Sequence, residues 1–203
     1  MKLIKMNEVQ AQKVSWLWYP YIPYGKITLI QGDPGDGKTT FVLAIAALLT
    51  NGKPMPESED TAAMPVTVIY QTAEDGLADT IKPRLEEVSA DCSRVIVIDE
   101  SEQALTLSDS RIEQAIIKTN AKLLILDPLQ AYLGNNVDMH RANEIRPIFK
   151  ALAGVAERTG CAILIIGHMN KMNGAKGLYR GLGSIDIAAA VRSILNEKEK
   201  KSS

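Results

Sequence analysis

Cysteine is scarce in this chain, and long apolar runs are missing altogether. The two cysteines, Cys92 and Cys161, have no spacing typical of a disulfide framework or a metal site. No apolar stretch approaches the roughly 20 residues that a membrane helix needs, and the first residues lack the apolar segment of a secretory signal. These absences predict a protein of the reducing cytoplasm that has no membrane partner.

An excess of charge of either sign is missing too. The chain has 23 Lys and Arg residues against 24 Asp and Glu residues, which gives a formal net charge of −1. A protein that covers nucleic acid with a broad face has a basic surface, so any nucleic-acid contact here must come from a few loops. What is present is 203 residues with 46% hydrophobic and 23% charged residues, typical of one globular domain with a substantial core.

Residues 26–40 carry the most specific motif of the sequence. The segment from residue 32 to residue 39 reads Gly-Asp-Pro-Gly-Asp-Gly-Lys-Thr, which fits the P-loop pattern between a strand-like run and a helix-like run. Glycines let successive backbone N–H groups face a phosphate, and the start of the following helix adds its positive dipole. We therefore expect Lys38 to reach the β- and γ-phosphates of ATP and the Thr39 hydroxyl to bind Mg²⁺. The expected nucleotide-binding residues of this loop are Gly32, Asp33, Pro34, Gly35, Asp36, Gly37, Lys38, Thr39 and Thr40.

A second motif follows at residues 123–127, where four apolar residues end in Asp127. A buried parallel strand would carry this carboxylate to its C-terminal end, which is where ligands bind in open α/β sheets. An acid at a strand end is often only a helix cap, but together with a P-loop it indicates a magnesium residue. We expect Asp127 to hold Mg²⁺ through a water molecule, opposite Thr39.

Strand and helix signals alternate along the chain, which favours an α/β fold with a mainly parallel sheet. Ahead of them, residues 16–24 hold both tryptophans and several tyrosines, and this segment is interpreted as an arm that packs on the sheet or contacts another subunit. The expected divisions are an N-terminal aromatic arm over residues 1–25, an ATPase core over 26–195 and a charged, frayed tail over 196–203. The expected strands are 26–31, 66–70, 94–98, 122–126, 162–167 and 187–195.

The order of these motifs resembles that of RecA-like P-loop ATPases, and within them the RepA-type group of hexameric replicative helicases. The resemblance covers residues 16–195 and rests on the P-loop, the acid-ending strand and four further segments, which are Trp-Leu-Trp ahead of Ile-Pro-Tyr-Gly at 16–25, Tyr-Gln-Thr-Ala-Glu-Asp at 70–75, His-Met-Asn-Lys at 168–171 and Arg-Gly-Leu-Gly-Ser at 180–184. It implies a RecA-like P-loop NTPase fold, with a mainly parallel sheet flanked by helices. Such cores usually continue for several more strands, so this chain is expected to lack the last strands.

The resemblance also implies catalytic roles. In RecA-like enzymes the catalytic glutamate follows the second strand, where Glu74 stands, and a carboxylate beside the γ-phosphate can orient and deprotonate the attacking water. Asp75 is its rival, with helix capping as the favoured task. His168, after the apolar run 162–167, resembles a residue that senses the γ-phosphate, and the alternative is a core histidine with a satisfied hydrogen bond. Arg84 resembles an adenine-stacking residue.

Cationic residues complete the implied site. Lys171 and Lys176 lie in the Gly- and Asn-rich stretch 170–177, which resembles the nucleic-acid loop of a ring channel, and a solvated loop with no partner is the alternative. Arg192 resembles the arginine finger that completes the ATP site of a neighbouring subunit. Arg180, counted with the nucleic-acid-binding residues, is the runner-up for that role.

Together these features predict Mg²⁺-dependent ATP hydrolysis coupled to nucleic-acid binding or translocation. The leading interpretation is a RepA-like DNA helicase domain that takes ATP, Mg²⁺ and single-stranded DNA and that forms a hexameric ring of identical subunits when full length. Two alternatives stay open: a RecA/RadA-like recombination ATPase, and a regulatory P-loop ATPase that acts on protein partners. The lysine-bearing loop favours nucleic acid over a switch that touches only proteins.

Overall fold

A six-stranded parallel sheet forms the centre of the molecule, in the order β5-β4-β6-β7-β3-β8. The structure is a computed structural model that describes residues 1, 3–11, 13–58, 64–134, 137–139, 141–168 and 185–196. Its strands are β3 (Ile27–Gly32), β4 (Val68–Thr72), β5 (Val95–Ile96), β6 (Leu123–Asp127), β7 (Ala162–His168) and β8 (Ser193–Asn196). A separate antiparallel pair, β1 (Trp16–Trp18) and β2 (Ile22–Pro23), precedes them.

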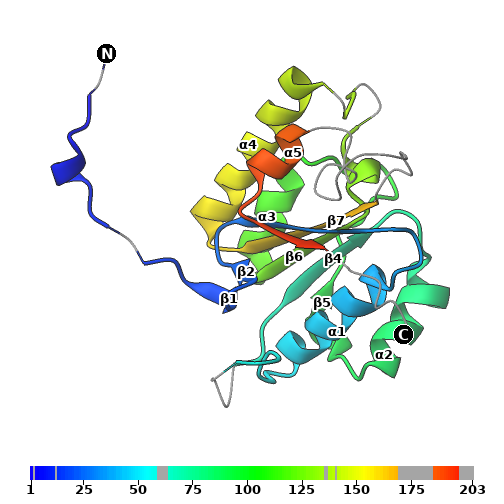
Figure 1. The fold of residues 1–203 in the computed structure, drawn as a ribbon. Helices are drawn as coiled ribbons and strands as arrows, with labels where there is room; N and C mark the ends of the chain where they lie inside the picture. Colours follow the sequence, from blue (N-terminus) through cyan, green and yellow to red (C-terminus); the bar gives the residue numbers. More distant parts are fainter. Residues whose placement is uncertain are drawn as a thin grey trace, which may run out of the picture.

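Helices cover both faces of this sheet (Figure 1). One face carries α1 (Lys38–Thr50) and α2 (Lys82–Glu87), the latter preceded by a π-helical turn at Leu77–Ile81. The other face carries α3 (Ser110–Thr119), α4 (Ala142–Thr159) and α5 (Ile185–Ala190). Short 3₁₀ turns lie at Met6–Glu8, Cys92–Arg94 and Leu129–Tyr132. No helix in the described ranges has the length and hydropathy of a membrane span.

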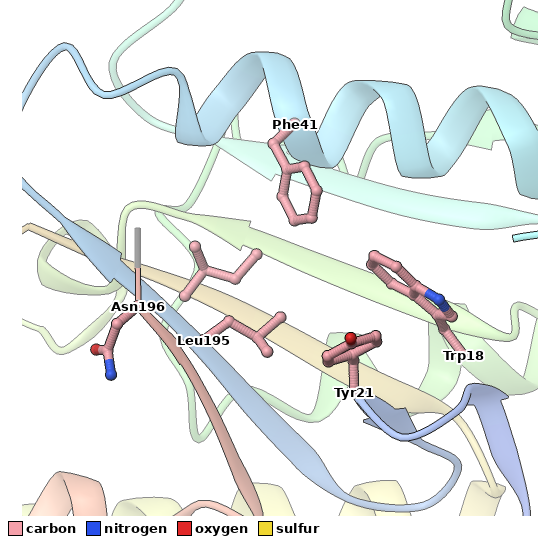
Figure 2. A pocket seen from close by; sticks show the side chains of 6 residues that line it. Trp18, Tyr21, Phe41, Leu195 and Asn196 are labelled. Carbon is pink, nitrogen blue, oxygen red and sulfur yellow. The ribbon is translucent and has the colours of Figure 1, made fainter. Parts of the chain in front are cut away.

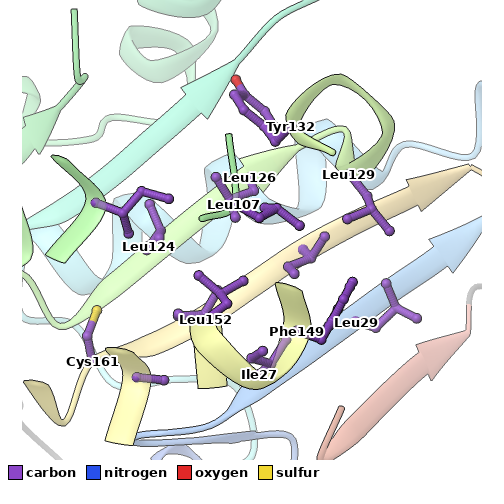
Figure 3. Packing of buried hydrophobic residues seen from close by; sticks show 14 of the residues in the cluster. Ile27, Leu29, Leu107, Leu124, Leu126, Leu129, Tyr132, Phe149, Leu152 and Cys161 are labelled. Carbon is purple, nitrogen blue, oxygen red and sulfur yellow. The ribbon is translucent and has the colours of Figure 1, made fainter. Parts of the chain in front are cut away.

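Burial on both faces explains why the central strands read as continuous apolar runs. Every residue of β3 and β6 is buried, as expected for a parallel sheet that has helices on each side. Alternate residues of β6 then divide between the two faces, so Leu124 and Leu126 pack under Phe149 and Leu152 of α4 (Figure 3). By the same alternation, the odd-numbered residues of β6, including Asp127, face α1.

Five of the six expected strands are present within a few residues of their expected bounds, and the sixth is a correction. The single strand expected at 187–195 is wrong, because the chain forms helix α5 up to Ala190 and enters β8 only at Ser193. Three successive alanines, at positions 188–190, favour helix over strand. A parallel neighbour of β3 also requires a crossover, which a helix usually supplies. Arg192 therefore lies between α5 and β8, and not within a strand as the expected bounds imply.

The N-terminal segment divides into a packed part and an extended part. Ile22 is fully buried, and Trp18 and Tyr21 pack against the core on the α1 face. The Trp18 indole donates a hydrogen bond to the Pro56 carbonyl over 2.9 Å. The described residues before position 16 are exposed, and the ribbon leads them away from the sheet (Figure 1).

Candidate nucleotide-binding and catalytic site

The P-loop connects the C-terminal end of β3 to the first turn of α1. Gly35 and Gly37 have φ angles of 92° and 86°, in the left-handed region that side chains disfavour, and Gly37 occupies the N-cap position of α1. A Cβ at Gly35 would meet no atom within 4 Å, so backbone conformation and not crowding is what requires glycine there. The loop thus presents its backbone at the positive end of a 13-residue helix, an arrangement that suits phosphate groups.

Lys38 holds its ammonium group inside this loop. Its Nζ donates to the carbonyl oxygens of Gly32 at 3.0 Å and of Asp33 at 2.6 Å, and only 4% of the residue is exposed. The positive charge is therefore fixed beside the loop backbone and held away from bulk solvent, where electrostatic interactions are strong. A contact between Lys38 and phosphates stays a prediction.

Asp127 accepts two hydrogen bonds at the end of β6. The hydroxyls of Thr39 and Tyr70 both donate to its Oδ2, each over 2.9 Å. Burial raises the pKa of Asp127, and these two hydrogen bonds oppose that rise because they stabilise the ionised form. Burial and the nearby Asp127 charge likewise raise the pKa of Tyr70.

The oxygen atoms of Thr39 and Asp127 suit a magnesium ion that shares its ligands with a nucleotide better than a metal held by protein side chains alone. Within the described ranges, no group of three or more His, Cys, Asp or Glu side chains is arranged to hold a metal. One hydroxyl and one carboxylate, from Thr39 and Asp127, match the way Mg²⁺ is bound in nucleotide sites, where phosphates and waters supply the other ligands. Thr39 therefore lies beside Asp127, and the magnesium role of this pair stays a prediction.

Tyr70 is a site residue that sequence reasoning missed. It lies in β4, which pairs with β6 in a register that sets Tyr70 opposite Ile125 and Thr72 opposite Asp127. A tyrosine two positions from the pair that contains Asp127 is within reach of that carboxylate along the same sheet face. The only signal in the sequence is a hydroxyl-bearing side chain that follows two apolar residues of β4, and the strand order was needed to interpret it.

Glu74 and His168 lie together at the same end of the sheet. The Ala73 N–H donates to the Asp127 carbonyl over 3.3 Å, which holds the chain that leads to Glu74 beside β6. His168 ends β7 and pairs in register with Gly32 of the P-loop strand. The Glu74 Oε2 atom is 3.6 Å from His168 Nε2, and the Glu74 side chain is 61% exposed. A carboxylate here can bind a water molecule in front of the P-loop.

A second residue that sequence reasoning missed is Gln130, in the turn after β6. Its Nε2 atom donates a long hydrogen bond, 3.5 Å, to the His168 carbonyl. Three buried polar atoms around this turn lack a hydrogen-bond partner within the described part of the chain: Gln130 Oε1, Tyr132 Oη and His168 Nδ1. No motif marks Gln130 in the sequence, because its role depends on which strand lies beside β6.

Arg84 lies beside α1, on the side of this helix that faces away from β8. With Thr40 and Leu43 it lines a pocket of about 450 Å³, so the candidate adenine contact is close to the P-loop helix. Its guanidinium pairs with Asp75 at 3.2 Å. The helix-capping task favoured for Asp75 is wrong, because Gly76 takes the N-cap position and no side chain caps that turn.

A smaller apolar pocket, of about 210 Å³, lies on the β8 side of α1. Figure 2 shows Phe41 reaching down from α1 toward Leu195 of β8, with Trp18 and Tyr21 closing the pocket from the arm. The Trp18 and Tyr21 rings are 4.7 Å apart between centroids. The aromatic arm therefore packs beside the P-loop helix, next to the candidate site but outside its polar cluster.

Arg192 is far from the P-loop of its own chain. Its N–H donates to the Ile27 carbonyl over 2.8 Å, at the N-terminal end of β3, whereas the P-loop begins at Gly32. Five residues of strand separate the two ends by about 16 Å, so the exposed Arg192 lies at the opposite end of β3 from the P-loop. Lys171, Lys176 and Arg180 lie outside the described residues.

Comparisons with known proteins agree with this architecture. The model of the AAA_25 family, an AAA domain, matches residues 4–174. The DNA repair protein RadA of Halalkalibacterium halodurans is 26% identical over 155 residues, and that of Campylobacter jejuni is 27% identical over 156 residues. Each alignment covers 75% of this chain, which spans about 30% of the length of those relatives.

A solved structure supports the fold alone. A KaiC-like protein from Pyrococcus horikoshii OT3 superposes with a TM-score of 0.61 at 16% identity, over 96% of this chain and 84% of that one. The family match covers most of the chain, and the sheet, the P-loop and the acid-ending strand have the arrangement described above. The chain belongs to the AAA_25 family and is a RecA-like P-loop ATPase domain.

Proposed function

We propose that this domain hydrolyses ATP with Mg²⁺ and couples hydrolysis to nucleic-acid binding or translocation, as a RepA-like DNA helicase domain. The observation that carries the proposal is the convergence of Lys38, Thr39, Asp127 and Glu74 at the C-terminal ends of neighbouring parallel strands. Ligand sites of open α/β sheets lie at these ends. The four residues supply a cation, a hydroxyl and two carboxylates of different exposure.

Different roles follow from their different surroundings. The loop backbone and Lys38 would bind the β- and γ-phosphates, and Thr39 with Asp127 would hold Mg²⁺, which neutralises charge on those phosphates when bound. The exposed Glu74 would orient the attacking water and accept its proton, with the buried Asp127 kept for the metal. Arg84 would contact the base from its pocket beside Thr40.

Two observations support the nucleic-acid part of the proposal. The RadA relatives are named as DNA repair proteins, and the stretch after β7 carries Lys171, Lys176 and Arg180 in a chain whose net charge is only −1. A local cluster of cations is what such a chain needs to contact phosphates. The RadA likeness also favours the second candidate, a recombination ATPase that assembles on DNA.

The test is the ATPase rate with and without single-stranded DNA, together with oligomeric mass in a non-hydrolysable ATP analogue. We expect Mg²⁺-dependent turnover, stimulation by DNA, and a ring-sized mass with nucleotide. A Lys171→Ala, Lys176→Ala double variant should keep the basal rate and lose stimulation, with the salt slope of DNA binding reduced by about one unit per contact. Hydrolysis that no nucleic acid stimulates would favour the protein-switch alternative.

A further inference from the structure

The turn Leu129–Tyr132 follows β6 and contacts the end of β7. Leu129 and Tyr132 are 0% and 1% exposed and belong to the core under α4, so they fix the backbone of the turn. Gln130, between them, is half-buried and directs its amide to the carbonyl of His168, where β7 ends. The turn that follows Asp127 thus contacts the residue that faces Glu74.

Two buried polar atoms at this contact have complementary chemistry. Gln130 Oε1 accepts hydrogen bonds, whereas His168 Nδ1 can carry a proton and donate one, and neither has a partner within the described ranges. Leaving two such atoms buried and unpaired costs free energy that a mutual hydrogen bond would recover. The bond from Gln130 to the His168 carbonyl already holds the two residues side by side.

We propose that Gln130 is a positioning residue, which fixes the His168 ring so that Nε2 faces Glu74. A hydrogen bond from Nδ1–H to the Gln130 amide oxygen, which would pair these two atoms, would set both the ring orientation and the nitrogen that carries the proton. The opposite ring nitrogen, Nε2, is then held toward the Glu74 carboxylate, 3.6 Å away. Gln130 acts through His168 and does not touch the nucleotide.

The proposal rests on the proposed ATPase function for its kinetic consequence. Because His168 is the last residue of β7 and the predicted nucleic-acid loop begins two positions later, the Gln130 contact lies between Asp127 and that loop. A residue in this place links the metal-binding strand to the segment that carries Lys171 and Lys176.

The kinetic test compares Gln130→Met, which keeps the shape and removes the amide, with Gln114→Met on the exposed side of α3 as its matched control. We expect Gln130→Met to lower kcat about 3–10-fold, the size expected of one hydrogen bond, with KM for ATP unchanged. In a double variant with His168→Asn, no further loss should appear, because both changes remove one interaction. Losses that multiply, or an unchanged kcat in Gln130→Met, would overturn the proposal.

A second measurement does not require hydrolysis. The chain has two histidines, His140 and His168, so ring ¹⁵N signals of histidine-labelled protein can be assigned with a His140→Ala variant. We expect Gln130→Met to shift the His168 ring nitrogens and Gln114→Met to leave them in place. Unshifted signals in folded Gln130→Met would overturn the proposal. If the wild-type protein hydrolyses no ATP, the proposed function fails, and the ¹⁵N shifts still decide the contact.

Discussion

The two ends of the central sheet differ in the chemistry that they hold. At the C-terminal ends of the strands, a buried lysine donates to a P-loop carbonyl, two hydroxyls donate to the Asp127 carboxylate, and a histidine lies 3.6 Å from the Glu74 carboxylate. At the N-terminal ends, the cations are exposed, as Arg192 is, or paired on the surface, as Lys26 is with Glu157 at 2.7 Å. The first end therefore has groups suited to a charged ligand, and the cations of the second end face solvent.

The comparison is sharpest between two lysines at opposite ends of β3. Lys38→Ala should abolish nucleotide binding or hydrolysis, because its buried ammonium is the cation that the P-loop itself supplies. Lys26→Ala, at the other end, removes an exposed ion pair that solvent screens and should leave turnover intact. Nucleotide affinity and steady-state ATPase rates of both variants measure this difference between Lys38 and Lys26. Normal turnover in Lys38→Ala would refute the candidate site.

Substitution of Arg192 tests whether the N-terminal ends of the strands contribute to the ATP site of a neighbouring subunit. Arg192→Ala should lower hydrolysis by about 10³–10⁵-fold if this residue completes the site of another subunit. Arg158→Ala is the matched control, since that arginine also lies toward this end and is already paired with Glu113 at 2.9 Å. Mixing Arg192→Ala with Lys38→Ala subunits should restore part of the activity at interfaces that combine the two intact residues. No recovery in co-assembled rings would favour Arg180.

Substitutions at Glu74 and Asp75 test which of these two neighbouring carboxylates, at the C-terminal ends of the strands, is the general base. Glu74→Gln should keep nucleotide binding and lose hydrolysis by about 10²–10⁴-fold, the usual contribution of a general base. Asp75→Asn should be mild, because its carboxylate pairs with Arg84 and not with His168. Single-turnover rates in excess enzyme separate chemistry from binding. If Asp75→Asn loses most hydrolysis and Glu74→Gln loses little, the general base is Asp75 and not Glu74.

The sequence predicts the C-terminal end of the sheet better than its N-terminal end, for a physical reason. Phosphate binding requires glycines, a lysine and a threonine at fixed spacing, so Lys38, Thr39 and Asp127 can be identified without knowing the strand order. Tyr70 and Gln130 contribute one hydrogen bond each across neighbouring strands, and no local spacing records such a pairing. The strand expected at 187–195 was wrong because its alanines suit a buried strand and a helix equally well by hydropathy, whereas the crossover requires the helix.

Two buried tyrosines near Asp127 give the smallest and most discriminating prediction. Tyr70 donates to the Asp127 carboxylate, whereas the Tyr132 hydroxyl has no partner within the described ranges. Tyr70→Phe should therefore lower the free energy of unfolding by about 1.5–3 kcal/mol, the range for a hydrogen bond to a charged group. Tyr132→Phe should be neutral or stabilising, because it removes an unsatisfied hydroxyl from the core.

The pH dependence of this difference has a definite sign. The Tyr70 hydrogen bond favours the ionised form of Asp127, so it lowers a pKa that burial raises. The loss in Tyr70→Phe should be full at pH values above the folded-state pKa of Asp127 and should shrink as the pH falls through it, since protonation removes the charge that the hydroxyl stabilises. Urea unfolding of both variants across this range measures it. Equal losses in Tyr70→Phe and Tyr132→Phe, or a loss independent of pH, would mean that the Tyr70 hydroxyl serves packing and not the carboxylate that is proposed to hold Mg²⁺.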